Sequence, residues 1–289
     1  MNDNPQLIRY KKLIRFIDDH LNEDLNIEKV EEICHYSYRN INRIFEAIHQ
    51  ETIGKYVKRL RLEKAAQYLK YSDMGISQIG YQVGFEDRTA FSKAFKKRYD
   101  MAPQDYRDQT ERDLEGLQKK TISLESGQRK PLQYAIEFLP EFNYLFLEYR
   151  GDYGDNNAVE SAWEKLFLHG ADLDLVSENT LFMTEILDDE EISDCINSRY
   201  RFSIILEHPL EKEPNDLLHL NKHKRQKYAK FTHQGSQQSL NDYYQSLFAF
   251  WIMDVQRELV DLPILEFYPN YEENLAENQL ITEIYIAIE

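Results

Sequence analysis

The chain has 289 residues, 42% of them hydrophobic, and a formal net charge of −16. This length is typical of about two domains, and the apolar content excludes a disordered or low-complexity chain. The longest apolar run, residues 247–253, is far shorter than the roughly 20 residues of a membrane helix, and residues 1–10 lack the apolar stretch of a secretory signal. We therefore expect a folded cytoplasmic protein without a membrane partner. The two distant cysteines, Cys34 and Cys195, predict no disulfide scaffold.

Acidic residues are concentrated in the second half of the chain. Residues 1–120 contain 22 Lys and Arg against 20 Asp and Glu, whereas residues 121–289 contain 13 against 31. Because an acidic surface repels phosphates and attracts cations, the two halves are suited to different partners. The first half is able to approach nucleic acid, and the second is suited to positively charged molecules.

An internal repeat with an offset of 50 residues marks the first half. The two copies begin at Ser37 and Asp87, which are both favourable helix N-caps. The apolar positions that match between the copies are Ile41, Ile44 and Phe45 with Phe91, Ala94 and Phe95. A shorter amphipathic segment precedes each copy, at 27–34 and 76–83, so the repeat predicts two helix-turn-helix units.

Each repeated helix combines an apolar stripe with a polar face. In the first copy, Ile41, Ile44, Phe45 and Ile48 recur at helical spacing, which predicts that they are buried. The opposite faces carry groups that can bond base edges and phosphates. The candidate DNA-contacting residues are Tyr38, Arg39, Asn42, Arg43, Arg88, Thr89, Lys93, Lys96 and Lys97, with Arg98 as a further phosphate contact. A polar face is typical of any surface helix, but its duplication in two such units favours DNA reading.

One long helix is predicted between the copies. Residues 53–71 contain no proline, and at 1.5 Å per residue their length of about 28 Å is close to the roughly 34 Å between successive major grooves on one face of B-DNA. The chain is therefore able to present both copies to one face of DNA. The basic residues of this helix either contact the DNA backbone or form a solvated face; they are Lys58, Arg59, Arg61 and Lys64.

Residues 75–107, GISQIGYQVGFEDRTAFSKAFKKRYDMAPQDYR, resemble the second-motif signature of the AraC/XylS family of transcription regulators. With the first motif included, the resemblance covers residues 8–107. It departs from the family pattern at Gly80, where alanine is usual, and at Gln50 and Asp100, where glycine commonly ends each recognition helix. The resemblance implies a double helix-turn-helix domain that binds double-stranded DNA, with RNA polymerase as a further partner. The residues that it places on bases or backbone are Arg39, Asn42, Arg43, Arg88, Thr89 and Lys93.

A polar, charged segment separates the two halves. Residues 108–130 contain Gly116, Ser126 and Gly127 and are followed by Pro131. We predict an all-α DNA-binding domain over 1–110, a linker over 111–130 and an α+β domain over 131–289.

The α+β domain shows a weak duplication of strand, glycine turn, helix and two strands. The first copy comprises strands near 146–151, 181–187 and 201–206 with a helix around Trp163, and the second comprises strands near 228–235, 264–268 and 281–288 with a helix around Tyr244. Two such β-α-β-β units, joined through their sheets, leave a cleft at their pseudo-twofold axis. A cleft of this kind is suited to a small molecule.

This layout resembles the GyrI-like (gyrase-inhibitor-like) effector-binding domain over about 130–289. The resemblance rests on HQG at 233–235, LEFY at 265–268 and TEIYIAI at 282–288, and it departs from the family at Ala287 and at the basic run 223–227. It implies that Glu266 lies on the floor of an aromatic pocket for cationic, hydrophobic effectors, as in multidrug recognition. A carboxylate beside aromatic faces attracts a delocalised cation. The ligand-binding candidates are Glu266, Tyr268, Trp163, Tyr149, Tyr244 and Tyr285.

A structural explanation of these residues is the alternative. Aromatic residues at helical or strand spacing are more often part of a core, and a lone glutamate in a strand usually faces solvent. The resemblance to the GyrI-like domain is what favours a pocket.

The sequence contains no familiar catalytic motif. It has no GxSxG, HExxH, Walker or GxGxxG pattern, and His219 and His223 lack a third metal ligand. We therefore expect neither an enzyme nor a cofactor or metal site, and predict a DNA-binding transcription regulator whose C-terminal domain binds a small cationic or amphipathic effector. The alternative is a GyrI-like small-molecule hydrolase fused to a DNA-binding module, and turnover of a ligand distinguishes the two. The acidic second half disfavours a purely architectural DNA-binding protein.

Overall fold

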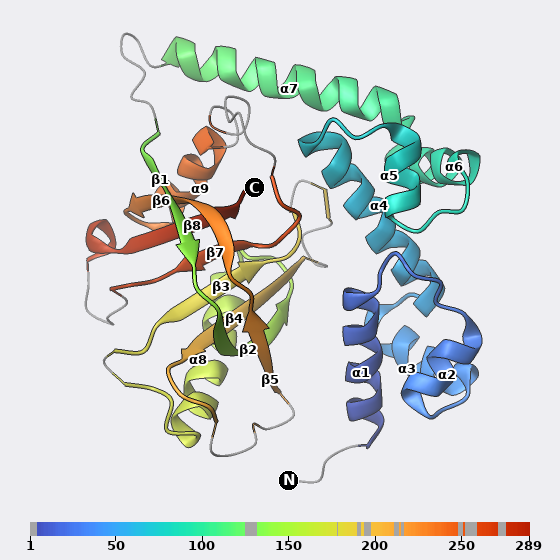
Figure 1. Cartoon of the computed structure of the whole chain (residues 1–289), viewed down its shortest axis with the longest axis horizontal. Helices are drawn as coiled ribbons and strands as arrows, with labels where there is room; N and C mark the ends of the chain where they lie inside the picture. Colours follow the sequence, from blue (N-terminus) through green and yellow to red (C-terminus); the bar gives the residue numbers. More distant parts are fainter. Residues whose placement is uncertain are drawn as a thin grey trace. The chain divides into compact units, whose positions relative to one another are not determined.

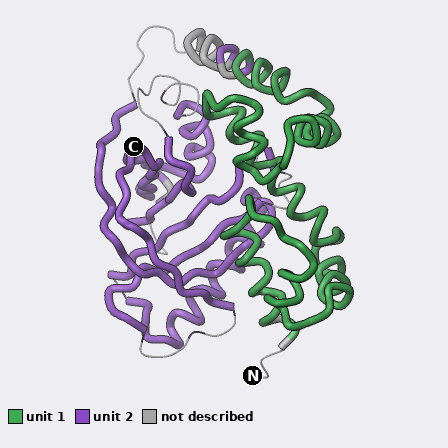
Figure 2. The backbone as a smooth tube through the Cα atoms, turned by 45° about the vertical axis from the view of Figure 1, so that its right-hand side comes forward, with its two compact units in different colours: residues 1–112 green, residues 113–289 purple. Residues whose placement is uncertain are grey.

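A computed structural model of the chain describes residues 5–124, 132–177, 179–189, 192–193, 198–210, 214, 217–247, 251, 259–270 and 276–289. The chain divides into two compact units, Met1–Arg112 and Asp113–Glu289 (Figure 2). Among the described helices, none is long and apolar enough to cross a membrane. Cys195, the second cysteine, lies outside the described residues.

The first unit is helical, as the sequence predicts. Its helices are α1 (Pro5–Asp19), α2 (Ile27–Cys34), α3 (Tyr38–His49), α4 (Ile53–Tyr71), α5 (Ile76–Gln82), α6 (Arg88–Tyr99) and the start of α7 (Pro103–Leu124). Helices α2 and α3 form one helix-turn-helix motif, and α5 and α6 form the other. Helix α4 has the bounds predicted for the long linking helix, with α1 to α3 at one end and α5 and α6 at the other (Figure 1).

Local hydrogen bonds and backbone conformation explain where these helices begin and end. Asp87 accepts a hydrogen bond from the Ala90 N–H at 2.8 Å and so caps α6, whereas Ser37 begins α3 without a side-chain bond. Gln50 and Asp100 follow α3 and α6 with φ of +58° each, the left-handed conformation that glycine usually supplies at this position. Helices α3 and α6 therefore both end at a left-handed residue that is not glycine.

The apolar stripe of α3 is only partly as predicted. Ile41 and Phe45 are fully buried and Ile44 is half-buried, but Ile48 is 50% exposed, so its predicted burial is wrong. The neighbouring His49 takes the inward position at this end of the helix. Its ring lies 4.3 Å from that of Phe45, and its Nε2 is 2.6 Å from the hydroxyl of Tyr10.

Most of the predicted linker is helical. Helix α7 continues to Leu124, and the rest of the predicted linker, 125–130, lies outside the described residues. The segment contains no proline after Pro103, and its charged residues and glutamines are good helix formers. Gly116 lowers helix propensity without ending the helix.

The second unit contains an antiparallel sheet with the order β1-β6-β8-β7-β3-β4-β2-β5. Its elements are β1 (Tyr134–Leu139), β2 (Phe142–Arg150), α8 (Asn156–Asp172), β3 (Phe182–Ile186), β4 (Arg199–Leu206), β5 (Leu218–His223), β6 (Gln226–Gln234), α9 (Gln237–Ser246), β7 (Ile264–Phe267) and β8 (Ile281–Ala287). The two predicted β-α-β-β units are β2-α8-β3-β4 and β6-α9-β7-β8 (Figure 1). The edge strands β1 and β5 were not predicted, and each pairs with the first strand of one unit.

Two short connections show that the sheet is strongly curled. Only residues 140–141 separate β1 from β2, and only residues 224–225 separate β5 from β6, although these strands lie near opposite ends of the sheet order. Each connection spans at most about 11 Å, so the two ends of the sheet approach each other. The rings of His223 in β5 and Tyr228 in β6 are accordingly 5.8 Å apart.

The curl gives the sheet two different faces. Both helices cover one face, where Leu166 of α8 and Leu240 of α9 pack against strand residues. The other face turns inward and buries a cluster that includes Tyr144, Phe146 and Tyr285. The two units join where β3 pairs with β7, which places Thr184 directly opposite Glu266.

Candidate nucleic-acid interface and ligand site

The exposed face of α3 carries two arginines. Arg39 and Arg43 lie one turn apart and are exposed. Asn42 is half-buried, and its Oδ1 accepts a hydrogen bond from the Ile53 backbone N–H at 3.0 Å, where α4 begins. Tyr38 is also half-buried and packs against the core of the motif. Of the four predicted residues on this helix, the two arginines face outward, whereas Asn42 holds the junction between α3 and α4.

The second recognition helix, α6, carries a larger basic surface. The predicted residues that are exposed on it are Arg88, Thr89, Lys93, Lys96 and Lys97. Phe91 and Phe95 are fully buried on the opposite side and fix the rotation of the helix. Arg98, expected as a further phosphate contact, donates from its Nη2 to Oε1 of the buried Glu63 at 2.8 Å.

Two of the four basic residues predicted on α4, Arg59 and Arg61, form hydrogen bonds to other residues within the first unit. Arg59 is buried and donates to Glu51 at 2.8 Å and to Glu63 at 3.1 Å. Burial opposes its charge, but hydrogen bonds and the negative charges of the two glutamates raise its pKa overall. Arg61 donates to three backbone carbonyls. Neither of the two expected roles, DNA backbone contact or solvated face, applies to Arg59 and Arg61.

A buried carboxylate lies at the centre of the second unit. Glu266, in β7, is 1% exposed. The Tyr244 hydroxyl donates to its Oε1 at 2.7 Å, and the Tyr268 hydroxyl donates to its Oε2 at 2.7 Å. A third hydroxyl, that of Tyr153, lies 3.5 Å from Oε2, and Thr184 Oγ1 lies 2.8 Å from the Tyr268 hydroxyl. Among the described residues, Glu266 has no basic partner.

Aromatic rings separate this carboxylate from solvent. The rings of Tyr153, Trp163, Tyr244 and Tyr268 are half-buried, in contrast to Glu266. Trp163 of α8 meets Tyr268 edge to face with centroids 5.8 Å apart, and Tyr153 stacks on Tyr200 at 4.6 Å. The cluster therefore consists of one buried carboxyl group surrounded by aromatic rings, and when ionised this combination attracts a large cation.

The surroundings of Glu266 disfavour its charge. Burial raises its pKa, and the hydroxyls of Tyr268, Tyr244 and Tyr153 counteract this effect only in part. Burial, together with the nearby carboxylate, also raises the pKa of Tyr244 and Tyr268 well above the usual value. A negative charge at Glu266 therefore lacks full compensation within the protein.

Two predicted ligand residues lie elsewhere. In β8, Ile284 and Ile286 face the helices, so Tyr285 points to the inner face of the curl, and its predicted place beside Glu266 is wrong. Tyr149 stacks against Phe202 at 5.6 Å, and its hydroxyl donates to the Asp152 carbonyl, so it does not contact Glu266.

Two residues of the cluster were not predicted from the sequence. Tyr153 lies in the turn after β2, and Thr184 lies in β3 opposite Glu266. The one sequence signal for Tyr153 is its position between Gly151 and Gly154, in a turn that brings its ring back over the sheet. Strand pairing, which places Thr184, is not visible in a single sequence.

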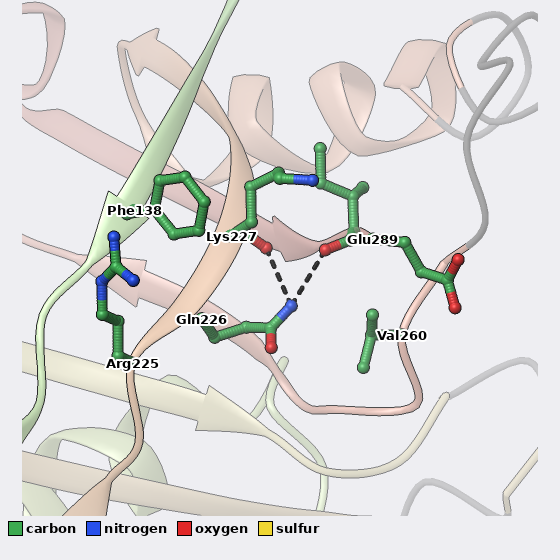
Figure 3. Close-up of a pocket in the computed structure, with 7 residues that line it drawn as sticks. Phe138, Arg225, Gln226, Lys227, Val260 and Glu289 are labelled. Carbon is green, nitrogen blue, oxygen red and sulfur yellow. Dashed lines mark hydrogen bonds between the residues drawn. The ribbon is translucent and has the colours of Figure 1, made fainter.

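A separate hollow of about 420 Å³ lies beside β1, the start of β6 and the residues that follow β8 (Figure 3). Its lining residues include Phe138, Arg225, Gln226, Lys227 and Val260. Gln226 closes its floor by donating to the Lys227 and Ile288 carbonyls. The hollow shares no lining residue with the Glu266 cluster. The described residues also contain no group of three His, Cys, Asp or Glu side chains that would hold a metal ion.

Comparison with known proteins finds two family matches along the chain. Residues 31–109 match a helix-turn-helix domain family, and residues 132–289 match the GyrI-like small molecule binding domain. Regulatory protein SoxS of Salmonella typhimurium is 34% identical over 95 residues, which cover 33% of this chain and 89% of SoxS. Transcriptional regulator Rob of the same organism is 28% identical over 138 residues, which cover 48% of this chain and 44% of Rob.

The solved structure of an AraC-type transcriptional regulator from Chromobacterium violaceum is similar to part of this chain. It covers 35% of this chain and 91% of its own, with 24% identity and a TM-score of 0.33. The family matches carry the assignment, because the GyrI-like match spans more than half of the chain and SoxS matches over most of its own length. The chain therefore belongs to the AraC/XylS family of DNA-binding transcription regulators and carries a GyrI-like small molecule binding domain.

Proposed function

We propose that this regulator binds a cationic or amphipathic effector at Glu266 and reads DNA with α3 and α6. The observation that carries the effector proposal is a 1% exposed carboxylate that accepts tyrosine hydrogen bonds and has no basic partner among the described residues. Trp163, Tyr153, Tyr244 and Tyr268 supply the aromatic walls of this site.

A cation at this position is stabilised in two ways. It neutralises Glu266, whose charge is disfavoured by burial, and it gains from the negative faces of the surrounding rings. Because the rings are half-buried and lie between the carboxylate and solvent, we propose that a ligand reaches Glu266 by displacing one or two of them. An extended apolar cation therefore fits this chemistry better than a small, strongly hydrated one.

We infer that the cluster binds its ligand without transforming it. The relatives SoxS and Rob are a regulatory protein and a transcriptional regulator, which supports this proposal over the hydrolase alternative. Recovery of an effector unchanged after prolonged incubation is the expected result, and turnover would favour the hydrolase. RNA polymerase is a further proposed partner, on the basis of the family's role in transcription.

The charge preference of the site is tested with two ions of nearly the same shape, tetraphenylphosphonium and tetraphenylborate. Tetraphenylphosphonium is expected to raise the melting temperature of the full chain, because a ligand present at 100 times its Kd stabilises the folded state by about 2.7 kcal/mol. Tetraphenylborate is expected not to stabilise the second unit. Equal stabilisation by both ions would show that apolar area, and not charge, decides binding.

The DNA-reading proposal is tested on one residue of each recognition helix. Arg43→Ala is expected to weaken binding to a specific operator by about 1–3 kcal/mol, the range for a residue that reads a base edge. Lys93→Ala is expected to weaken binding more evenly across sequences, as for a phosphate contact. Lys165→Ala on α8 removes one exposed charge from the other unit and serves as the control. Unchanged operator affinity in both variants would remove these residues from the interface.

A further inference from the structure

Arg61 bonds the loop before the first helix-turn-helix motif and the turn of the second motif at once. Its Nε donates to the Leu21 carbonyl at 2.8 Å and its Nη2 donates to the Glu23 carbonyl at 2.6 Å, both in the loop between α1 and α2. Its Nη1 donates to the Gly84 carbonyl at 2.9 Å, in the turn between α5 and α6. One guanidinium in the middle of α4 therefore ties the loop before the first motif to the turn of the second.

The backbone at Gly84 is shaped for this contact. Gly84 has φ of +85°, and a Cβ atom there would lie 2.7 Å from the Asn22 carbonyl oxygen and 2.9 Å from Arg61 Cζ. The loop 21–23 and the turn of the second motif thus approach each other at a point where no side chain fits.

Apolar packing does not close the space beside this contact. A hollow of about 280 Å³ adjoins Arg61. Its lining includes Asp24, Leu25 and Tyr38 from the first motif and its preceding loop, Val57 from α4 and Phe85 from the second motif. Polar bonds from Arg61, rather than close-packed side chains, span this part of the junction.

A chain of ion pairs braces the other side of α4. Glu51, in the turn before α4, pairs with Arg59 at 2.8 Å, and Arg59 pairs with Glu63 at 3.1 Å. Glu63 also pairs with Arg98 of α6 at 2.8 Å. These pairs continue from the end of the first motif to the second recognition helix, and Glu63 is 3% exposed.

We propose that Arg61 is a positioning residue that fixes the distance and rotation between α3 and α6, and thereby sets the operator half-site spacing that this protein accepts. The ion pairs Arg59–Glu63 and Glu63–Arg98 help to fix the same distance and rotation. One inserted base pair moves a half-site by about 3.4 Å and turns it by about 35°, so a rigid pair of helices matches one spacing, whereas a loosely joined pair tolerates several. The inference rests on the proposed reading of DNA by α3 and α6.

The test compares spacing preference in the wild type and in Arg61→Lys. Lysine keeps the charge, but a single ammonium cannot reproduce the fork of a guanidinium toward three carbonyls. Selection of the full wild-type chain on a random-sequence duplex library first defines the half-sites. The affinity for duplexes with one base pair inserted or removed between the half-sites then gives the spacing preference. The affinity for a duplex with one half-site shows whether a single recognition helix still binds its bases.

The wild type is expected to lose about tenfold or more in affinity when the spacing changes by one base pair, the size of one mismatch in a specific site. Arg61→Lys is expected to lose less than about threefold, while its affinity for the single half-site stays within about twofold of the wild type. A general loss of stability would instead lower affinity for every duplex. Arg112→Lys, an exposed arginine on α7, is the matched control and is expected to keep the wild-type spacing preference.

If Arg61→Lys does not fold, as judged by circular dichroism, Gly84→Ala replaces it, since the added methyl group would lie 2.7 Å from the Asn22 carbonyl oxygen and 2.9 Å from Arg61 Cζ and so forces the loop, the turn and the guanidinium apart. A folded variant with the wild-type spacing preference would overturn the inference, as would a wild type that tolerates every spacing. Failure of the proposed DNA reading would look different, because the selection would then enrich no sequence at all.

Discussion

Replacing Glu266 with glutamine is expected to stabilise the C-terminal unit at neutral and alkaline pH. Burial raises the pKa of this carboxyl above its ordinary value, so the folded state holds its proton more tightly than the unfolded state does. The stability associated with this proton is complete below the ordinary pKa and is lost as pH rises through the raised pKa. Glutamine keeps an acceptor and a donor for the tyrosine hydroxyls and cannot ionise.

Thermal unfolding of the full chain at a series of pH values measures this effect. The variant is expected to exceed the wild type at about pH 8 by roughly 1.4 kcal/mol for each unit by which the pKa is raised, and to match it near pH 4. Glu164→Gln, which replaces an exposed glutamate on α8, is the matched control. A difference between wild type and Glu266→Gln that does not change with pH would contradict the account of this carboxyl.

Glu63→Ala is expected to have the largest effect on the stability of the DNA-binding unit. Glu63 is 3% exposed and accepts hydrogen bonds from Arg59 and Arg98, so its removal takes a carboxylate away from two guanidinium groups at once. Breaking a buried ion pair in this way costs roughly 3–5 kcal/mol. We expect urea denaturation, monitored by the helical circular dichroism signal, to show a decrease of this size in the free energy of unfolding.

Two variants separate the charge of Glu63 from its position. Glu63→Gln keeps the volume and one acceptor oxygen, so it is expected to cost less than Glu63→Ala. Glu51→Ala removes the more exposed partner of Arg59, because the Glu51 side chain is 20% exposed. It is therefore also expected to cost less stability than Glu63→Ala. A loss from Glu63→Ala of under about 1 kcal/mol, the value for a surface pair, would contradict the structural role given to Glu63.

The helical half was largely predictable because its information is local. Apolar periodicity and N-caps depend on residues a few positions apart, which is why the predicted bounds of α4 and the two motif helices agree with the structure. The role of a charged side chain depends on distant partners. Arg61 looked like a surface cation, but its acceptors lie 40 and 23 positions away at Leu21 and Gly84.

The ligand cluster was also predictable only where its contacts are local in sequence. Glu266 and Tyr268, both predicted ligand residues, lie on one side of the chain in and just after β7 and share a hydrogen bond. Tyr285, a ligand candidate from the resemblance to the GyrI-like domain, lies instead on the inner face of the curl, because the face that a strand residue occupies depends on how distant strands pair. Tyr153 escaped prediction because it reaches Glu266 from a turn 113 positions away.

The central claim is that the carboxylate of Glu266 supplies the countercharge for a cationic effector. Calorimetric titration of tetraphenylphosphonium into the full chain at about pH 8 tests it most directly, with wild type, Glu266→Gln and Glu164→Gln side by side. We expect wild type and Glu164→Gln to bind equally, and Glu266→Gln to bind at least about tenfold more weakly, a difference of 1.4 kcal/mol or more. Equal affinity in all three proteins, or no binding to the wild type, would contradict the claim.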